Sequence, residues 1–459
     1  MGKRQLAVGA IASAVALGVT GCAVGTGGAD DSGAEYSTDA ELSGDLSVMG
    51  FSGVDEVATS RVDYAEEQLG DVNVSLTEGD LDLQQFLSAV ATGNPPDIVY
   101  ASRDQIGSLA ARGAIVPLDR CIEGEGITTG DFVPAAIDQV TLEDVVYGIP
   151  EFNTVQLTMA NADLLSEAGL TVEDVNGSDW EAVSAASAAL AKGDGGDIQV
   201  IGYDSKLPEF LPLWAKANGV DLISEDGRTA QLDDPKVQEA LEWAVSIYDD
   251  QGGFSAVKAY RDSADFFGEG NQFATGVLGA MPMEQWYVNV LNDVSTDAPM
   301  AFDTVRDRSG NTIAFASGSA WAIPSGSDNP EAACRFARAM TSIDAWQAAA
   351  EARIEARKAE DKPFTGILTG NAKADAMIQD MTTSGGEPWD TAVAKMYEAN
   401  ESTFAMPANP ADAEFKQALF DAVNSVLSGD ATPQDALATA QENAQAALDD
   451  AWSSLESEK

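Results

Sequence analysis

The hydrophobic pattern of residues 46–101 alternates between two periods. Three short apolar runs predict β-strands, at 46–51, 72–77 and 97–101. Between them, apolar side chains recur at helical spacing over 54–69 and over 83–92, and each helix is expected to end at the glycine that follows it. This strand–helix–strand–helix–strand order predicts a mostly parallel sheet and an α/β fold.

Three later helices are marked by a side chain suited to helix capping, followed by proline. The pairs are Asp234-Pro235, Asn329-Pro330 and Thr432-Pro433. The oxygen of such a side chain accepts a hydrogen bond from the first helical turn, and the fixed φ of proline suits the first helical position. The last pair lies in a long amphipathic segment, 424–459, which we interpret as a packing element rather than a surface that captures a partner.

The N-terminal residues follow a different pattern. Two basic residues, Lys3 and Arg4, precede an apolar run over 6–19, which is shorter than the roughly 20 residues that span a bilayer. This layout predicts a secretory signal peptide over 1–21. Residues 22–44 are rich in Gly, Ser, Asp and Thr, a composition typical of a flexible tether.

The apolar run ends in Val19-Thr20-Gly21-Cys22, which resembles the bacterial lipobox. The resemblance implies cleavage before Cys22, attachment of diacylglycerol to its sulfur and, usually, acylation of the new amino terminus. Two or three acyl chains hold a soluble domain at a membrane, whereas a single chain anchors it only marginally. An ordinary signal peptide followed by an incidental cysteine is the alternative that the sequence leaves open.

Length and charge narrow the possible functions. The 459-residue chain is too long for one small core, so two lobes are expected. Its 75 acidic and 25 basic residues give a net charge of −50, which opposes nucleic-acid binding and is typical of a solvated surface. The chain has no histidine, which excludes Ser-His-Asp and Cys-His nucleophilic sites and the commoner zinc sites. Paired carboxylates of the glycosidase kind stay possible.

Two further cysteines, Cys121 and Cys334, raise the question of a disulfide. In an exported protein such a pair is often oxidised. The sequence alone does not bring the two residues within bonding distance, so both the bonded and the free state stay open at this point.

Residues 91–119, ATGNPPDIVYASRDQIGSLAARGAIVPLD, resemble the extracellular solute-binding proteins of bacterial ABC importers, in the sugar-binding branch that includes maltose-binding protein. Six further segments match the pattern of this branch in the order in which the family has them. They lie at 146–170, 179–191, 273–291, 316–342, 361–378 and 405–441. The resemblance spans roughly residues 45–450.

The resemblance implies an α/β, two-lobed periplasmic-binding-protein-like fold with three interlobe crossovers and a ligand cleft between the lobes. Lobe I is expected over 45–152 plus 313–366, and lobe II over 153–312 plus 367–459. The implied protein is not an enzyme, is a monomer without cofactor or metal, and is anchored to the outer face of the cytoplasmic membrane. It captures a sugar or oligosaccharide by lobe closure and delivers it to ABC permease subunits. One alternative is a binding protein for a polyol, a glycerophosphodiester or an amino-acid derivative. The other is a hydrolase that uses paired carboxylates.

Candidate ligand contacts in the first lobe lie on loops at the carboxyl ends of strands, where open α/β sheets bind ligands. The loop after the first strand offers Phe51, Ser52 and Asp55, and for Asp55 the alternative is helix capping. After the third strand, Asp104 falls where the resemblance implies an acid that binds ligand hydroxyls. Its neighbour Arg103 is expected either to contact the ligand or to orient that carboxylate.

The remaining candidates lie on the first crossover, on the second lobe and on the returning chain. They are Phe152, Asn153, Glu209, Phe210, Glu284, Gln285, Trp286, Gly318, Ser319 and Met406. Trp286 matches the aromatic platform of the family, and a buried tryptophan is the alternative. Two positions depart from the maltose-binding pattern: Thr154 replaces an acid, and Phe415-Lys416-Gln417 replaces aromatic residues that stack on sugar. We therefore do not assume the same sugar.

Overall fold

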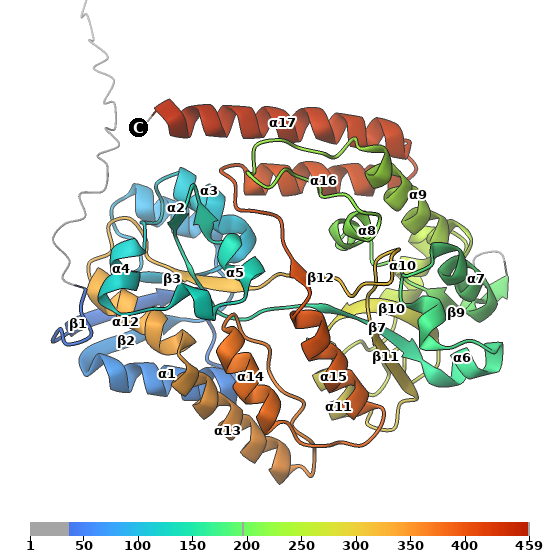
Figure 1. The fold of residues 1–459 in the computed structure, drawn as a ribbon, viewed down its shortest axis with the longest axis horizontal. Helices are drawn as coiled ribbons and strands as arrows, with labels where there is room; N and C mark the ends of the chain where they lie inside the picture. Colours follow the sequence, from blue (N-terminus) through green and yellow to red (C-terminus); the bar gives the residue numbers. More distant parts are fainter. Residues whose placement is uncertain (1–35, 195–196, 458–459) are drawn as a thin grey trace, which may run out of the picture. The chain divides into compact units, whose positions relative to one another are not determined.

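The computed structural model describes residues 36–194 and 197–457 and contains two five-stranded β-sheets (Figure 1). The first sheet has the strand order β2-β1-β3-β13-β6. Its strands are β1 (Ser43–Met49), β2 (Asp71–Thr77), β3 (Ile98–Ser102), β6 (Ile149–Pro150) and β13 (Ser319–Ala322). β1 pairs in parallel with β2 and β3, as the strand–helix order predicts, whereas β13 runs antiparallel to β3 and β6. The sheet is therefore completed by a strand from far along the chain.

Helices cover both faces of this sheet and form the first lobe with it. They include α1 (Glu56–Leu69), α2 (Leu83–Ala91), α3 (Ile106–Ala111), α12 (Pro330–Thr341) and α13 (Ile343–Ala359). Buried side chains of α1 and α12 share one hydrophobic cluster with Ile98, whereas Phe86 of α2 and Leu109 of α3 pack with Val99 in another. Because neighbouring strand residues point to opposite faces, this cover on both sides explains the continuous apolar run of β3.

β1 lies slightly earlier in the chain than the strand expected over 46–51. Its parallel pairing with β2 runs in register from Ser43 to Met49 and includes polar edge positions that a hydrophobic pattern does not mark. The strand stops at Gly50, which has a φ of +90°. A Cβ at Gly50 would lie 2.5 Å from the carbonyl oxygen of Tyr100, so only glycine fits this turn.

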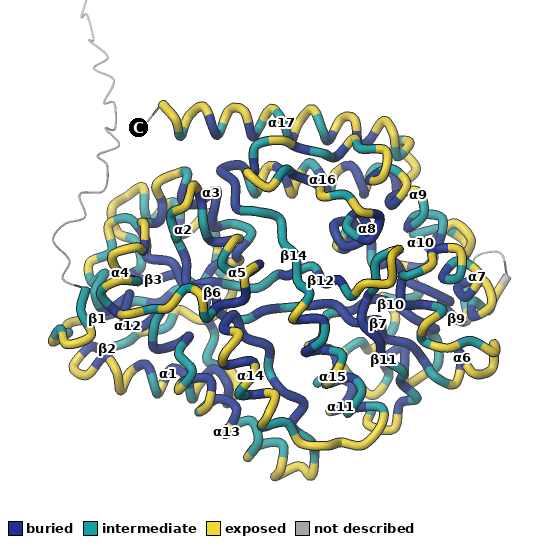
Figure 2. The backbone as a smooth tube through the Cα atoms, viewed as in Figure 1, coloured by how far each residue is buried: buried dark blue, intermediate teal, exposed yellow. Residues whose placement is uncertain are grey.

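The second sheet has the order β11-β7-β10-β9-β8 and forms the second lobe with its helices. Its strands are β7 (Gln156–Asn161), β8 (Lys192–Asp194), β9 (Asp197–Tyr203), β10 (Leu278–Glu284) and β11 (Met300–Thr304). The helices include α7 (Trp180–Leu190), α8 (Leu211–Ala217), α9 (Pro235–Asp249), α10 (Phe254–Asp262), α11 (Trp286–Val294) and α15 (Trp389–Asn400). Every residue of β7, which lies between β10 and β11, is buried (Figure 2), so this strand is covered on both faces of the sheet.

The chain passes between the two lobes more than once. It leaves the first sheet after β6 and enters β7 through 151–155, and it returns from β11 to β13 through 305–318. It passes again between α14 (Ala372–Met381), which packs on α13, and α15, which packs on β11. The connecting segments lie side by side, since Thr154 bridges to Ser317 and Phe152 bridges to Thr369.

The C-terminal amphipathic segment, 424–459, spans the end of one helix and the whole of the next. α16 (Asp412–Leu427) and α17 (Pro433–Ser457) pack against each other, and a turn over 428–432 separates them. α17 begins at Pro433, as the Thr-Pro pair predicts, and contacts α9, while α16 also contacts α3 of the first lobe. The buried faces of both helices support the interpretation of this segment as a packing element.

Cys121 and Cys334 form a disulfide, with 5.8 Å between their Cα atoms. The bond joins α4 (Asp119–Gly124) to α12 inside the first lobe. Near it, the buried Arg335 binds Glu125 and donates to the backbone carbonyl oxygens of Ser37 and Ala40. The chain just before β1 is therefore held against the first lobe.

The expected signal peptide (1–21), Cys22 and the first part of the expected tether lie outside the described residues. Within the described residues, no helix combines the length and the apolar character that crossing a bilayer requires.

Candidate functional site

Arg103 follows β3 and is fully buried where the first two crossovers meet. Its guanidinium donates to the carbonyl oxygens of Phe152 and Ser317, both at 2.6 Å. It also donates to the side chains of Asn153 at 2.8 Å and Gln139 at 3.0 Å. In the described chain, each oxygen that accepts from Arg103 is neutral, and burial lowers the pKa of Arg103 to about 10. Arg103 therefore holds the crossovers together instead of facing a ligand.

Gly318 permits this close arrangement. Its φ is +149°, and a Cβ at this position would overlap the carbonyl oxygen of Phe152 and lie 2.8 Å from Nη1 of Arg103. The backbone carbonyl oxygen of the next residue, Ser319, accepts a hydrogen bond from the backbone N–H of Glu151 at 2.9 Å. The contribution of Gly318 and Ser319 is thus mainly the path of the backbone at the junction of the lobes.

A chain of hydrogen bonds continues from Asn153 into the third connecting region. Asn153 donates to Oδ1 of Asn400 at 2.6 Å, and Asn400 donates to Oδ2 of Asp375 at 2.8 Å. The backbone N–H of Thr369 donates to the other oxygen of Asp375 at 2.6 Å. Burial raises the pKa of Asp375 to about 7, although these hydrogen bonds oppose the shift. Asn400 and Asp375 were not predicted, because their role depends on contacts between distant segments and leaves no local pattern.

Gln285 is also occupied by the backbone of the first crossover. Its Oε1 accepts from the N–H of Val155 at 2.8 Å, and its Nε2 donates to the carbonyl oxygen of Asn153 at 3.3 Å. Its neighbours Glu284 and Trp286 are consequently fixed beside the crossover on the second-lobe side. Asp104, the neighbour of Arg103, is fixed beside the same crossover on the first-lobe side.

The Asp104 side chain is partly exposed and forms an ion pair with Lys416 of α16. Lys416 is one of the positions at which the sequence departs from the maltose-binding pattern, and half of its side chain is exposed. Both groups therefore face solvent and can exchange their mutual contact for a ligand. An exposed pair of this kind contributes roughly 0–1 kcal/mol, so exchanging it costs little.

Charged groups gather at the end of β10. Burial raises the pKa of Glu284, the nearby carboxylate of Glu209 adds to the shift, and the ammonium of Lys206 opposes it. Glu209 is exposed, and Lys206 and Glu284 are partly buried. These three side chains place two carboxylates and one ammonium group at this end of the strand. Lys206 was not among the predicted residues, although it lies in the loop that carries Glu209.

Trp286 is 36% exposed at the first residue of α11. The ring of Phe267, which is 65% exposed, lies next to its indole, with 6.1 Å between the centroids and 17° between the ring planes. Trp286 is thus not the buried tryptophan of the alternative interpretation. Phe267 was not predicted, because the pair Phe266-Phe267 in a polar loop does not show which of the two rings is partly buried and which is exposed.

Several predicted residues serve the interior or the helix ends. Phe51 is buried between Tyr100 and Trp321, and Phe210 is also buried. Phe152 packs edge-on against Trp346. Phe51 and Phe210 therefore stabilise the core, and the partly buried Phe152 packs at its edge.

Asp55 caps α1 by accepting from the N–H of Ala58 at 2.8 Å, as in the capping alternative. Ser52 accepts from the N–H of Gly79 at 2.8 Å. Met406 lines a separate cavity of about 900 Å³ together with Trp452. These three side chains do not join the group around Trp286 in the described contacts.

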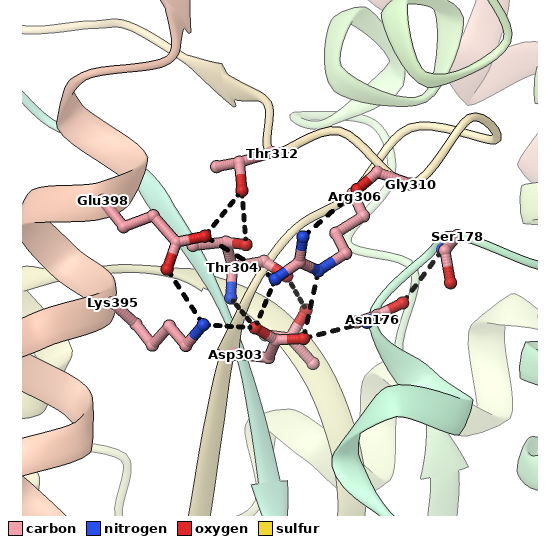
Figure 3. Close-up of polar contacts among 10 residues, drawn as sticks. Asn176, Ser178, Asp303, Thr304, Arg306, Gly310, Thr312, Lys395 and Glu398 are labelled. Carbon is pink, nitrogen blue, oxygen red and sulfur yellow. Dashed lines mark hydrogen bonds and ion pairs between the residues drawn. The ribbon is translucent and has the colours of Figure 1, made fainter.

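Figure 3 shows how the second crossover is fixed to the second lobe. Asp303, near the end of β11, accepts from Asn176 at 2.9 Å and lies 3.2 Å from Arg306 and 3.1 Å from Lys395. Lys395 also pairs with Glu398 at 2.9 Å, and both come from α15. Burial alone would raise the pKa of Asp303, but its hydrogen bonds outweigh burial and lower it. Two cations thus neutralise two carboxylates, and the cluster is a structural anchor.

The structure thus has two α/β lobes joined by adjacent connecting segments, with exposed aromatic and carboxylate groups beside those segments. This arrangement is that of a two-lobed solute-binding protein. In the described residues, no group of three or more His, Cys, Asp or Glu side chains is placed to hold a metal ion. The chain belongs to the bacterial extracellular solute-binding protein family, whose model matches residues 61–356.

Known relatives agree with this assignment. A maltooligosaccharide ABC transporter solute-binding lipoprotein of Streptococcus pneumoniae is 23% identical over 401 residues, which cover 82% of this chain and 84% of the relative. Among solved structures, mannobiose-bound CpMnBP1 has a TM-score of 0.69 at 22% identity, with 87% of this chain and 99% of that chain covered. An ABC substrate-binding protein of Listeria monocytogenes in complex with cycloalternan has a TM-score of 0.69 at 19% identity, with 89% and 99% covered. The predicted family and the two-lobed α/β fold are therefore confirmed.

Proposed function

We propose that this protein is an exported receptor that binds a sugar or oligosaccharide between its lobes and delivers it to the permease of an ABC transporter. The observation that carries the proposal is the exposed indole of Trp286, held beside Glu284 at the crossover. An aromatic face suits the apolar C–H surface of a sugar ring, and carboxylate and ammonium groups suit its hydroxyls. The sugar ligands of the S. pneumoniae relative and of CpMnBP1, according to their names, support the same class of ligand.

Binding in this proposal is a conformational equilibrium and includes no chemical step. A ligand that contacts Asp104 on the first lobe and Trp286 on the second favours the closed arrangement by its contacts to both. Glu284 and Glu209 then act as hydrogen-bond acceptors for hydroxyls, and neither serves as a nucleophile or a general acid. Release of new reducing ends from a bound oligosaccharide would contradict this part of the proposal.

The test is a thermal-shift screen of the purified protein against mono- and oligosaccharides, followed by calorimetric titration of the hits. A ligand that binds only the folded state raises the melting temperature. Trp286→Ala is expected to weaken binding by roughly 1–3 kcal/mol, the loss typical of a buried aromatic contact. Trp243→Phe is the control, because Trp243 stacks on Trp180 at 4.4 Å and takes no part in the candidate site. Unchanged affinity in the Trp286→Ala variant would refute the assignment of the site.

The proposal includes a lipid anchor at Cys22, as the lipobox resemblance implies and as the description of the S. pneumoniae relative as a lipoprotein supports. Cys22→Ala is expected to release the protein from the membrane fraction of the expressing cells. Replacement of another small residue of the same segment, Ser32→Ala, is the control and should leave the protein at the membrane. Retention of the Cys22→Ala protein in that fraction would contradict the anchor without affecting the proposed ligand class.

A further inference from the structure

Phe267 is an exposed aromatic side chain that the fold itself does not require. Apart from Val54, only Phe267 and Trp286 are large exposed hydrophobic residues in the described chain, and these two lie against each other. A phenyl ring left 65% exposed forgoes most of the stabilisation that burial would give. Exposed apolar groups that gather at one place are a sign of a binding surface.

The loop that carries Phe267 is fixed to the helix that carries Trp286. Phe266 stacks on Tyr287, with 4.2 Å between the ring centroids and 9° between the planes. The hydroxyl of Tyr287 also donates to the carbonyl oxygen of Phe266 at 2.8 Å. Since Tyr287 follows Trp286 in α11, these two contacts set the position of Phe267 relative to the indole.

The turn after Phe267 is closed as well. The N–H of Gly268 donates to the carbonyl oxygen of Asp265 at 3.1 Å, and a Cβ at Gly268 would overlap the Asp265 carboxylate. Asn271 then donates to the carbonyl oxygen of Gly268 at 2.9 Å. The exposure of Phe267 is therefore built into an ordered turn.

The geometry of the two rings leaves both available to a ligand. Trp180 and Trp243, which cover each other, have centroids 4.4 Å apart and planes at 10°. Phe267 and Trp286 are nearly parallel too, but their centroids lie 6.1 Å apart. Both residues stay exposed at this separation, which is of the order of one pyranose unit in an oligosaccharide.

We propose that Phe267 forms a second aromatic subsite beside Trp286, so that the preferred ligand is an oligosaccharide whose successive rings stack on the two side chains. This inference rests on the proposed function of the same site. Trp286, next to Glu284 and the crossover, holds the inner sugar unit. Phe267, on the outer loop, holds the next unit, and its larger exposed fraction fits a position farther from the crossover.

The test compares affinities for a series from mono- to tetrasaccharide of whichever sugar the screen identifies, measured by calorimetric titration. Phe267→Ala is expected to weaken binding of the longer members about tenfold, the loss of one aromatic contact, and to leave the shortest ligand unaffected. The affinity of Phe267→Leu, which keeps the bulk but not the ring, for the longer members should lie between those of the wild type and of Phe267→Ala. Phe254→Leu, a partly buried phenyl on α10 of the same lobe, is the control and should change no affinity.

Three outcomes separate this inference from the proposed function. If Phe267→Ala leaves the whole series unchanged, the ring is not a subsite, and docking of another protein on this patch becomes the better explanation. If the variant weakens the shortest and the longest ligand equally, Phe267 acts only by supporting Trp286, and the second subsite is refuted. If no sugar binds the wild-type protein, the proposed function itself fails.

Discussion

Replacing Asp375 by asparagine should change how the stability of the protein depends on pH. In the native state Asp375 is buried, and both of its oxygens accept hydrogen bonds, from Asn400 and from the backbone of Thr369. Burial raises its pKa to about 7, against about 3.9 for an aspartate in an unfolded chain. The folded protein therefore holds this proton more tightly than the unfolded chain does.

The direction and size of the effect follow from this difference. The contribution of Asp375 to the free energy of unfolding is fully present below about pH 4, where both states bind the proton. It is lost progressively as the pH rises through 7, because the unfolded chain releases the proton at a lower pH than the folded protein does. Between pH 5 and pH 8 the loss is about 2.5 kcal/mol, at 1.36 kcal/mol for each unit of pKa difference. Asparagine has nearly the same shape but does not titrate, so the variant lacks this contribution.

Urea denaturation of both proteins at several values between pH 5 and pH 8 measures the effect. The quantity of interest is the difference in free energy of unfolding between the variant and the wild type. Other buried carboxyls with a raised pKa, such as Asp412 and Glu284, are common to both proteins and cancel in that difference. We expect the variant to gain about 2.5 kcal/mol relative to the wild type from pH 5 to pH 8.

A constant offset between the two curves would refute the reasoning. Asparagine offers one acceptor where the carboxylate offers two, so a uniform loss of stability at all pH values is compatible with the structure. Parallel curves, however, would mean that Asp375 has the same proton affinity in both states. The burial-based explanation of its pKa would then be wrong.

Three further perturbations test the junction of the lobes and the first lobe. Arg103→Lys should lower the free energy of unfolding, measured by urea denaturation, by about 2–4 kcal/mol, because one ammonium cannot reach all the acceptors that the guanidinium joins. A variant as stable as the wild type would show that the crossovers do not depend on Arg103. Gly318→Ala should be more disruptive than a typical surface change, since its Cβ would overlap the Phe152 carbonyl oxygen; an unchanged melting temperature would contradict this. Replacing Cys121 and Cys334 by serine should lower the free energy of unfolding by up to about 5 kcal/mol, because the disulfide spans a sequence separation of 213 residues. Ligand affinity should not change, and loss of binding in a still-folded variant would show that the disulfide shapes the site.

Much of the fold could be predicted from local patterns. The helices that begin at Pro235, Pro330 and Pro433 start where the cap–proline pairs place them. The capping contacts differ. The carboxylate of Asp234 accepts from the backbone N–H of Lys236 at 2.7 Å, whereas the side chain of Asn329 donates to backbone carbonyl oxygens of β1. The helix start is thus a local property, but the partner of the capping side chain depends on the tertiary structure.

The sequence indicates the loops that carry the candidate residues, but not which of these residues are buried and which are exposed. Arg103 and Asp104 stand on the same loop, yet one is buried and the other faces solvent. The same holds for Gln285 and Trp286. The difference arises from contacts with residues such as Ser317, which is 214 positions away from Arg103, and no local pattern carries that information.

The residues that hold the first crossover are direct neighbours of the proposed ligand contacts. On each lobe, a buried residue that holds the first crossover stands directly beside a residue whose side chain reaches solvent: Arg103 beside Asp104, and Gln285 beside Trp286. Both holding residues bind Asn153, one at its side chain and the other at its backbone carbonyl. In the proposed function, a ligand that contacts both Asp104 and Trp286 therefore acts within one residue of the contacts that Arg103 and Gln285 share at Asn153. Because a ligand shifts an equilibrium only by its differential contacts, the proposed function predicts that a small solute at this place controls the relative position of the two lobes.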